Sequence, residues 1–139
     1  MRISKIFVTV DTVIIKKELS SIFLLLIKRK NEPFKDCWAL PGGFVDENED
    51  LEIAAKRELE EETQIKTTHL EQIGAFGKPF RDPRSHVISI AYFGIVDANA
   101  IAIASDDAKE VQWISINALP KLAFDHLDIV KAAIQKQNL

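Results

Sequence analysis

The amino-acid sequence predicts a mixed α/β sandwich. Three observations support this prediction: several apolar segments rich in β-branched residues, a strongly helix-forming segment in mid-chain, and a second helical pattern near the end. Strands, a helix, more strands and a final helix are the order expected when helices pack on a mixed sheet. The length of 139 residues suits one domain, and we assign residues 1–139 to it.

The first strands are predicted from runs of Val, Ile and Leu. Residues 6–15 are β-branched and apolar with polar interruptions, and residues 21–27 form a continuous apolar run that is typical of a buried strand. Residues 38–40 predict a short extended segment. The sequence Pro41-Gly42-Gly43 predicts a turn that ends it.

Residues 50–62 predict the central helix. The segment contains no Gly, Pro or aromatic residue, and Leu, Ala, Glu, Lys and Arg dominate it. Asn48 or Asp50 is expected to cap its first turn.

The second half of the chain predicts three more strands and a helix. Residues 69–76, 86–96 and 111–115 have strand patterns, and two prolines make residues 78–85 a loop. The final helix is expected to begin near Asp125, with one apolar face. That face consists of Ile129, Val130, Ala133 and Ile134.

Composition excludes several classes of protein. A chain that is 47% hydrophobic and 28% charged is neither collagen-like nor disordered. The single cysteine, Cys37, excludes an intramolecular disulfide and favours a reducing compartment. The longest strictly apolar run, Ile22 to Ile27, is far shorter than the roughly 20 residues that span a bilayer. With no signal-peptide pattern at the N-terminus, we expect a cytoplasmic protein without a membrane partner.

The net charge of −3 hides a local asymmetry. Residues 46–62 contain nine acidic and two basic residues, a charge of −7, so the rest of the chain carries +4. Such an acidic segment can bind divalent cations, while a basic remainder accepts an anionic ligand. The alternative is a solvated acidic helix, which is the usual role of a run of charges.

Helical periodicity favours the first alternative. Glu58, Glu61 and Glu62 lie at i, i+3 and i+4, on one stripe beside small apolar side chains. The opposite side of the helix carries an ion-paired, solvent-facing set: Glu52, Lys56 and Glu60. The stripe of glutamates therefore faces the protein.

Three neighbouring carboxylates on a protein-facing stripe require positive charge. Arg57 can reach Glu61, but one guanidinium does not neutralise three carboxylates. Mg²⁺ binds few carboxylates together with water and substrate phosphates, so the stripe predicts metal-dependent phosphoanhydride chemistry.

The same segment resembles a known family motif. The chain has Gly43, five residues, Glu49, seven residues and then Arg57-Glu58-Leu59-Glu60-Glu61-Glu62-Thr63-Gln64-Ile65. This pattern resembles the Nudix box of the Nudix hydrolases. One position departs, because Gln64 stands where the family has Gly. A glycine there suits a left-handed helix cap, and Gln costs about 1 kcal/mol.

The resemblance implies a Nudix-like α/β/α sandwich and hydrolysis of a nucleoside diphosphate linked to another moiety. It implies Mg²⁺, with Mn²⁺ as the alternative, held by Glu58 and Glu62. Glu61 is implied as a third ligand or a water-orienting group, and the carbonyl of Gly42 as a further ligand. Arg57 would orient the glutamates. The catalytic residues implied in this way are Arg57, Glu58, Glu61 and Glu62.

Weaker similarities narrow the substrate. Residues 33–46, 77–84 and 122–126 resemble the ADP-ribose pyrophosphatase branch, which also contains Nudix domains of bacterial regulators of NAD metabolism. This resemblance implies hydrolysis of ADP-ribose to AMP and ribose 5-phosphate. Members of the branch often dimerise, so a homodimer is an open alternative.

Loop 78–85 supplies candidates for substrate binding. The guanidinium groups of Arg81 and Arg84 can pair with diphosphate oxygens, and the ring of Phe80 can stack on a base. Trp38 is a second stacking candidate, with a place in the core as the alternative.

A late-loop acid is the last candidate, because Nudix enzymes often place one there as a metal ligand or a base. Three residues are open for this role: Asp106, Asp107 and Glu110.

Two other functions remain as alternatives. One is hydrolysis of another nucleotide, a nucleoside triphosphate, and the other is a module that senses ADP-ribose without hydrolysis. The intact glutamates and the lack of a basic DNA-reading helix after the domain argue against the sensor. We therefore expect a small-molecule nucleotide substrate and no nucleic-acid partner.

Overall fold

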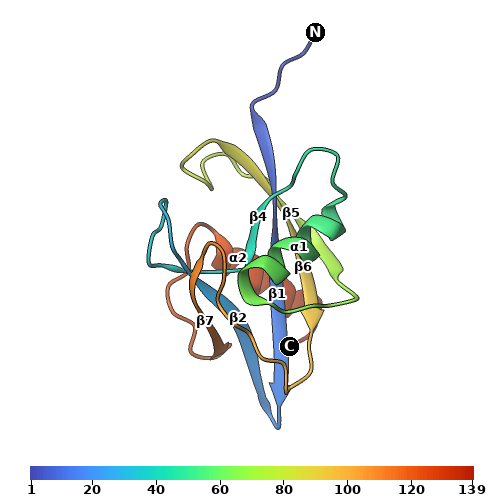
Figure 1. The fold of residues 1–139 in the computed structure, drawn as a ribbon, viewed down its shortest axis with the longest axis vertical. Helices are drawn as coiled ribbons and strands as arrows, with labels where there is room; N and C mark the ends of the chain where they lie inside the picture. Colours follow the sequence, from blue (N-terminus) through green and yellow to red (C-terminus); the bar gives the residue numbers. More distant parts are fainter.

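The computed structural model describes residues 1–139. It consists of a seven-stranded mixed sheet with one helix on each face (Figure 1). The predicted α/β/α sandwich is confirmed. The elements in chain order are β1 (Ile6–Glu18), β2 (Ser21–Arg29), β3 (Trp38–Ala39), β4 (Gly42–Phe44), α1 (Leu51–Thr63), β5 (Glu71–Phe76), β6 (His86–Ile95), β7 (Ala108–Ser115) and α2 (His126–Lys136).

Strand β1 organises the sheet because it has three partners. It pairs in parallel with β6 along residues 6–15. Its other edge is divided: Thr9–Asp11 pair with β4, and Ile15–Glu18 pair with β2. The two strands are therefore paired only from Ile15 to Glu18 of β1, next to their connection, and separate before Ile15. In the separated part, β4 lies on the edge of β1 and β3 lies on the edge of β2.

The two helices cover opposite faces of this sheet, with α1 in front and α2 behind in Figure 1. Alternation along β1 sends Val10 and Ile14 to the α1 side and Val13 and Ile15 to the α2 side. Helix α1 buries Ala54, Ala55 and Leu59 against the first pair. Helix α2 buries Ile129, Val130 and Ala133 against the second. Neither helix is long and apolar enough to cross a membrane.

The predicted turn at Pro41-Gly42-Gly43 needs a correction. Gly42 and Gly43 form strand β4 against Val10 and Asp11, and of the three residues only Pro41 lies in a bend. The carbonyl of Pro41 accepts hydrogen bonds from the N–H of Thr12 (2.9 Å) and from its Oγ1 (3.1 Å). The glycine pair resembles a turn in the sequence because its strand partners, Val10 and Asp11, lie far away along the chain.

Gln64 ends α1 in the left-handed conformation, with φ 60° and ψ 15°, and its N–H donates to the carbonyl of Glu60. This is the backbone geometry that favours glycine.

We expect Gln64→Gly to raise the free energy of unfolding by roughly 1 kcal/mol, because glycine removes the left-handed strain. Urea denaturation measures the change. Gln64→Ala keeps a Cβ and should match the wild type. A glycine variant no more stable than wild type would contradict the prediction.

Candidate active site

The opening between β1 and β2 holds a pocket of about 400 Å³. Its wall comes from β1, the end of β2, β4, α1, the loop 81–84 and the start of α2. Two carboxylates of α1, Glu58 and Glu62, lie on one side, and the arginines Arg29, Arg81 and Arg84 also line it. The pocket therefore combines an acidic and a basic half.

Glu62 is the most buried carboxylate of the acidic half, with 3% of its surface exposed. Its Oε1 accepts a hydrogen bond of 2.7 Å from the N–H of Gly42. Burial raises the pKa of Glu62 well above its ordinary value, and the charges of Glu58 and Asp11 add to the effect. No lysine or arginine forms a salt bridge with it.

Glu58 lies beside Glu62 under strand β4. Burial raises its pKa, and Arg57 opposes this effect. A Cβ atom on Gly43 would lie 2.5 Å from Cδ of Glu58, so a larger residue there would displace the Glu58 carboxylate.

Arg57 ties the helix to the segment that precedes it. Its guanidinium binds Glu49 with two hydrogen bonds of 2.7 and 2.9 Å, and it also donates to the carbonyl of Phe44 at 3.1 Å. A further nitrogen donates to Glu58 at 2.9 Å and to Glu61 at 3.2 Å. The bonds from Arg57 lower the pKa of Glu49 to about 2.

The three glutamates of the predicted stripe differ in how deeply their side chains are buried. Glu58 and Glu62 line the pocket, whereas the side chain of Glu61 is 42% exposed and lies at the rim beside Arg57. Glu60 is exposed and pairs with Lys66.

Of the three late-loop acids, Asp107 lines the pocket. Asp106 and Glu110 do not, and Glu110 pairs with Lys28 at 3.2 Å. The structure thus adds one carboxylate from this loop to the acidic half.

Arg81 and Arg84 both reach the pocket, but they differ in their partners. The side chain of Arg81 is 4% exposed and binds Asp125 at 2.6 and 2.9 Å, which anchors the loop to the start of α2. Arg84 is 40% exposed, pairs with the buried Asp82, and lies 5.0 Å from the ring centre of Phe44. Burial acts to raise the pKa of Asp82, but the bonds from Arg84 outweigh it and hold that pKa below its ordinary value.

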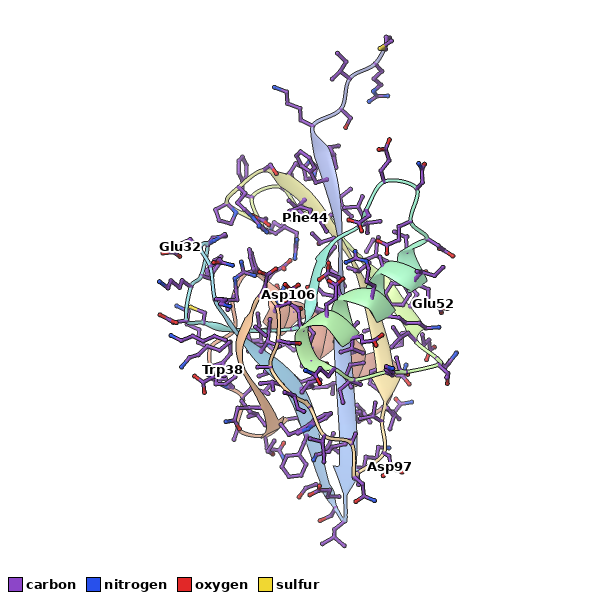
Figure 2. The ribbon with its side chains drawn as sticks, viewed as in Figure 1. Glu32, Trp38, Phe44, Glu52, Asp97 and Asp106 are labelled. Atoms are coloured by element: carbon purple, nitrogen blue, oxygen red, sulfur yellow. The ribbon has the colours of Figure 1, made fainter.

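The two stacking candidates lie elsewhere. The ring of Phe80 is 94% exposed and contributes nothing to the pocket wall. Trp38 packs against the core under α2, with the amine of Lys28 5.6 Å from its ring. In Figure 2 Trp38 lies on the β2 side of the molecule, apart from Phe44.

Other lining residues had no distinct signal in the sequence. Phe44 and Phe124 supply the aromatic rings, and the guanidinium of Arg29 lies 5.0 Å from the ring centre of Phe124. Arg29 donates to the carbonyl of Pro33 at 2.7 Å and forms no salt bridge. Burial and the charge of Arg84 lower its pKa. A half-buried cation without a carboxylate partner is suited to an anionic ligand.

The acidic half fits a cation that is only partly coordinated by protein. No three acidic or histidine side chains converge into a complete metal cage. Mg²⁺ typically uses one or two carboxylates together with water and substrate phosphates. The oxygen-only donors of Glu58 and Glu62, which repel each other within one site, fit that requirement.

The chain is an α/β/α sandwich, and helix α1 presents two inward-facing glutamates to a pocket that is also lined by arginines. This combination defines a Nudix-type domain. Residues 5–133 match the NUDIX domain family, and the chain belongs to that family.

Two characterised relatives are similar over most of the chain. The ADP-ribose pyrophosphatase of Methanocaldococcus jannaschii is 49% identical over 115 residues, which cover 83% of this chain and 68% of that protein. The ADPR responsive transcriptional repressor NtrR of Acinetobacter baylyi is 36% identical over 134 residues, or 94% of this chain. The chain spans only 54% of the length of the repressor.

Solved structures share the fold. The NUDIX domain of Shewanella oneidensis NrtR complexed with ADP ribose has a TM-score of 0.88 at 31% identity, covering 97% of this chain and 90% of that one. A bifunctional NMN adenylyltransferase/ADP ribose pyrophosphatase from Francisella tularensis, complexed with AMP and a Mn ion, has a TM-score of 0.83 at 31% identity. That match covers 98% of this chain and 43% of the other.

The raised pKa of Glu62 has a consequence for the stability of the metal-free protein. Because the folded-state pKa lies above the unfolded value, ionised Glu62 destabilises the fold, by about 1.4 kcal/mol for each tenfold weakening of its acidity on folding. We expect metal-free Glu62→Gln to be more stable than wild type at pH 8, since Gln still accepts the Gly42 N–H. The difference should shrink as the pH falls through the folded-state pKa and vanish near 4.5, the ordinary value.

Urea denaturation in EDTA across this pH range measures the difference. The solvent-facing Glu60→Gln serves as the control and should show no such pH-dependent gain. A Glu62→Gln protein less stable than wild type at pH 8 would show that the carboxylate supports the fold.

Proposed function

We propose that the protein hydrolyses ADP-ribose to AMP and ribose 5-phosphate in a Mg²⁺-dependent reaction. The observation that supports this proposal is the pocket of about 400 Å³, which is lined by Glu58 and Glu62 and by Arg29. Arg29 forms no salt bridge with a carboxylate. The ADP-ribose pyrophosphatase of Methanocaldococcus jannaschii, 49% identical, supports this choice of substrate. Water adds to one phosphorus, the bridging P–O bond breaks, and the two monophosphates leave.

Glu58 and Glu62 would hold the ion, with the Gly42 carbonyl as a further ligand and Glu61 supporting them from the rim. Bound there, a divalent ion would neutralise charge on the diphosphate and lower the pKa of an attacking water. The bonds from Arg57 and from the Gly42 N–H fix the two carboxylates before substrate arrives. The Mn ion in the Francisella tularensis structure supports Mn²⁺ as an alternative to Mg²⁺.

Arg29 and Arg84 are the substrate-binding cations in this proposal. Arg29 has no carboxylate partner, and Arg84 is the more exposed of the two loop arginines. The rings of Phe44 and Phe124 flank Arg84 at 5.0 and 5.8 Å and offer faces to a nucleobase. Arg81 holds the loop through Asp125, and Asp107 is the late-loop acid that we place in the site.

We also propose a cytoplasmic location and a homodimer. The free thiol of Cys37 is consistent with a reducing compartment. Ile6 and Phe7, at the start of β1, are exposed apolar side chains of the kind found at subunit interfaces.

A sensor of ADP-ribose is the second candidate, favoured by the similarity to the repressor NtrR. A substrate panel with and without EDTA separates the two. EDTA-sensitive release of AMP from ADP-ribose supports the enzyme, and tight binding without release supports the sensor. A tenfold preference for nucleoside triphosphates would overturn the proposed substrate and leave Nudix chemistry in place.

We expect Glu58→Gln and Glu62→Gln each to lower kcat by about 10²- to 10⁴-fold, because each removes a charge that holds the ion. Steady-state rates in Mg²⁺ measure the effect. Glu60→Gln, on the same helix but facing solvent, should change kcat less than about threefold. Equal losses at Glu60 and Glu62 would refute the assignment of the inward-facing pair.

Arg29→Met should raise KM for ADP-ribose by about 10- to 100-fold, since a charge-assisted hydrogen bond is worth about 1.5–3 kcal/mol. Arg29→Lys keeps the charge and should recover part of the loss. The matched control is Phe80→Ala, which should leave KM within about twofold, because this ring lies outside the pocket. A larger effect of Phe80→Ala than of Arg29→Met would instead place the substrate on the loop surface.

A further inference from the structure

The bend at Leu40–Pro41 joins β3, on the edge of β2, to β4, on the edge of β1. It lies where β1 and β2 separate, so regular strand pairing ends on either side of it. The next residue, Gly42, gives its N–H to Glu62 of α1. The position of this peptide therefore decides where the buried carboxylate lies.

Hydrogen bonds from both faces of the sheet hold the backbone of Leu40, Pro41 and Gly42. On the α1 side, Glu62 accepts the Gly42 N–H. Within the sheet, Thr12 donates twice to the Pro41 carbonyl. On the α2 side, the Leu40 N–H donates to Nδ1 of His126 at 3.0 Å.

His126 is the first residue of α2 and is 4% exposed. Because Nδ1 accepts a hydrogen bond, the neutral ring carries its proton on Nε2, which lies 3.5 Å from Oδ1 of Asp11. Burial lowers the pKa of His126, in agreement with the neutral form. Asp11 is buried and accepts a further hydrogen bond from the hydroxyl of Ser89.

These contacts form a continuous series from the α2 side of the sheet to the α1 side. Ser89 donates to Asp11, Asp11 lies 3.5 Å from Nε2 of His126, and Nδ1 of His126 accepts from the N–H of Leu40, two residues before Gly42. None of these groups needs to touch an ion to influence where Glu62 lies.

We propose that His126, oriented by Asp11, is a positioning residue that sets the ion affinity of the Glu58–Glu62 site through the Leu40–Gly42 segment. This inference rests on the proposed function in one respect, the assignment of Glu62 as an ion ligand. It requires no assumption about the substrate.

The test is direct titration of metal-free protein with Mn²⁺, with the free ion followed by electron paramagnetic resonance. His126→Phe keeps the ring volume and loses the acceptor, and it should weaken Mn²⁺ binding by about 10- to 100-fold. His126→Asn places an amide oxygen near the position of Nδ1, and should bind Mn²⁺ within about threefold of wild type.

Ile129→Val is the control for a merely structural effect. Ile129 is fully buried on the same helix, so this change lowers Tm without removing a hydrogen bond to the Leu40 peptide, and Mn²⁺ affinity should stay at the wild-type level. If His126→Phe does not fold, the comparison of His126→Asn with His126→Gln replaces it. The longer amide of Gln reaches the Nε2 position, so that variant should show the loss.

Three results would each overturn the positioning role. His126→Phe could bind Mn²⁺ with wild-type affinity, Ile129→Val could weaken Mn²⁺ binding as much as His126→Phe does, or His126→Asn could bind Mn²⁺ as weakly as His126→Phe. A wild-type protein that binds no Mn²⁺ would overturn the metal site together with this inference. Mn²⁺ binding with the expected variant pattern but without hydrolysis of ADP-ribose would support the positioning role and refute the proposed enzyme.

Discussion

The guanidinium of Arg57 is the contact on which the arrangement of the site depends. Two inward-facing glutamates one helical turn apart repel each other, and desolvation adds to the cost of keeping them ionised. Arg57 compensates part of this charge while it binds Glu49 and the carbonyl of Phe44. The segment 44–49 is thereby held against α1, and Gly43 of β4 lies directly against the Glu58 carboxylate. One planar group with five donors can satisfy all of these partners, which a lysine could not do.

The acidic half of the site was predictable because its determinants are local. A 13-residue helix with a 3.6-residue period places Glu58 and Glu62 on the inward stripe, whatever the rest of the chain does. The depth of each carboxylate was not predictable. Glu61 shares the stripe, yet its side chain is 42% exposed and does not line the pocket.

The basic half depends on tertiary packing, and here sequence reasoning was less successful. Two prolines and a basic pair correctly mark the loop 78–85, but the direction of each side chain follows from distant partners. Asp125, 44 residues away, draws Arg81 inward, whereas Phe80, next to it, is left in solvent. Arg29 and Phe124 come from opposite ends of the chain and meet only because the end of β2 lies beside the start of α2. The periodicity of the sequence does not predict a contact between residues so far apart in the chain.

The divided edge of β1 has an evolutionary consequence. Strand β4 pairs with one portion of that edge and lies beside Glu58 and Glu62 of α1, whereas the arginines of the pocket come from the end of β2 and from a loop before β6. Substitutions or insertions after Arg29 and around Arg84 can therefore reshape what is recognised without moving the carboxylates. A scaffold built in this way can acquire new substrates by exchanging peripheral loops while it retains a single hydrolytic chemistry. The separate attachment of the carboxylates and the arginines along β1 thus gives a structural basis on which duplicated copies of the domain can diverge in substrate specificity.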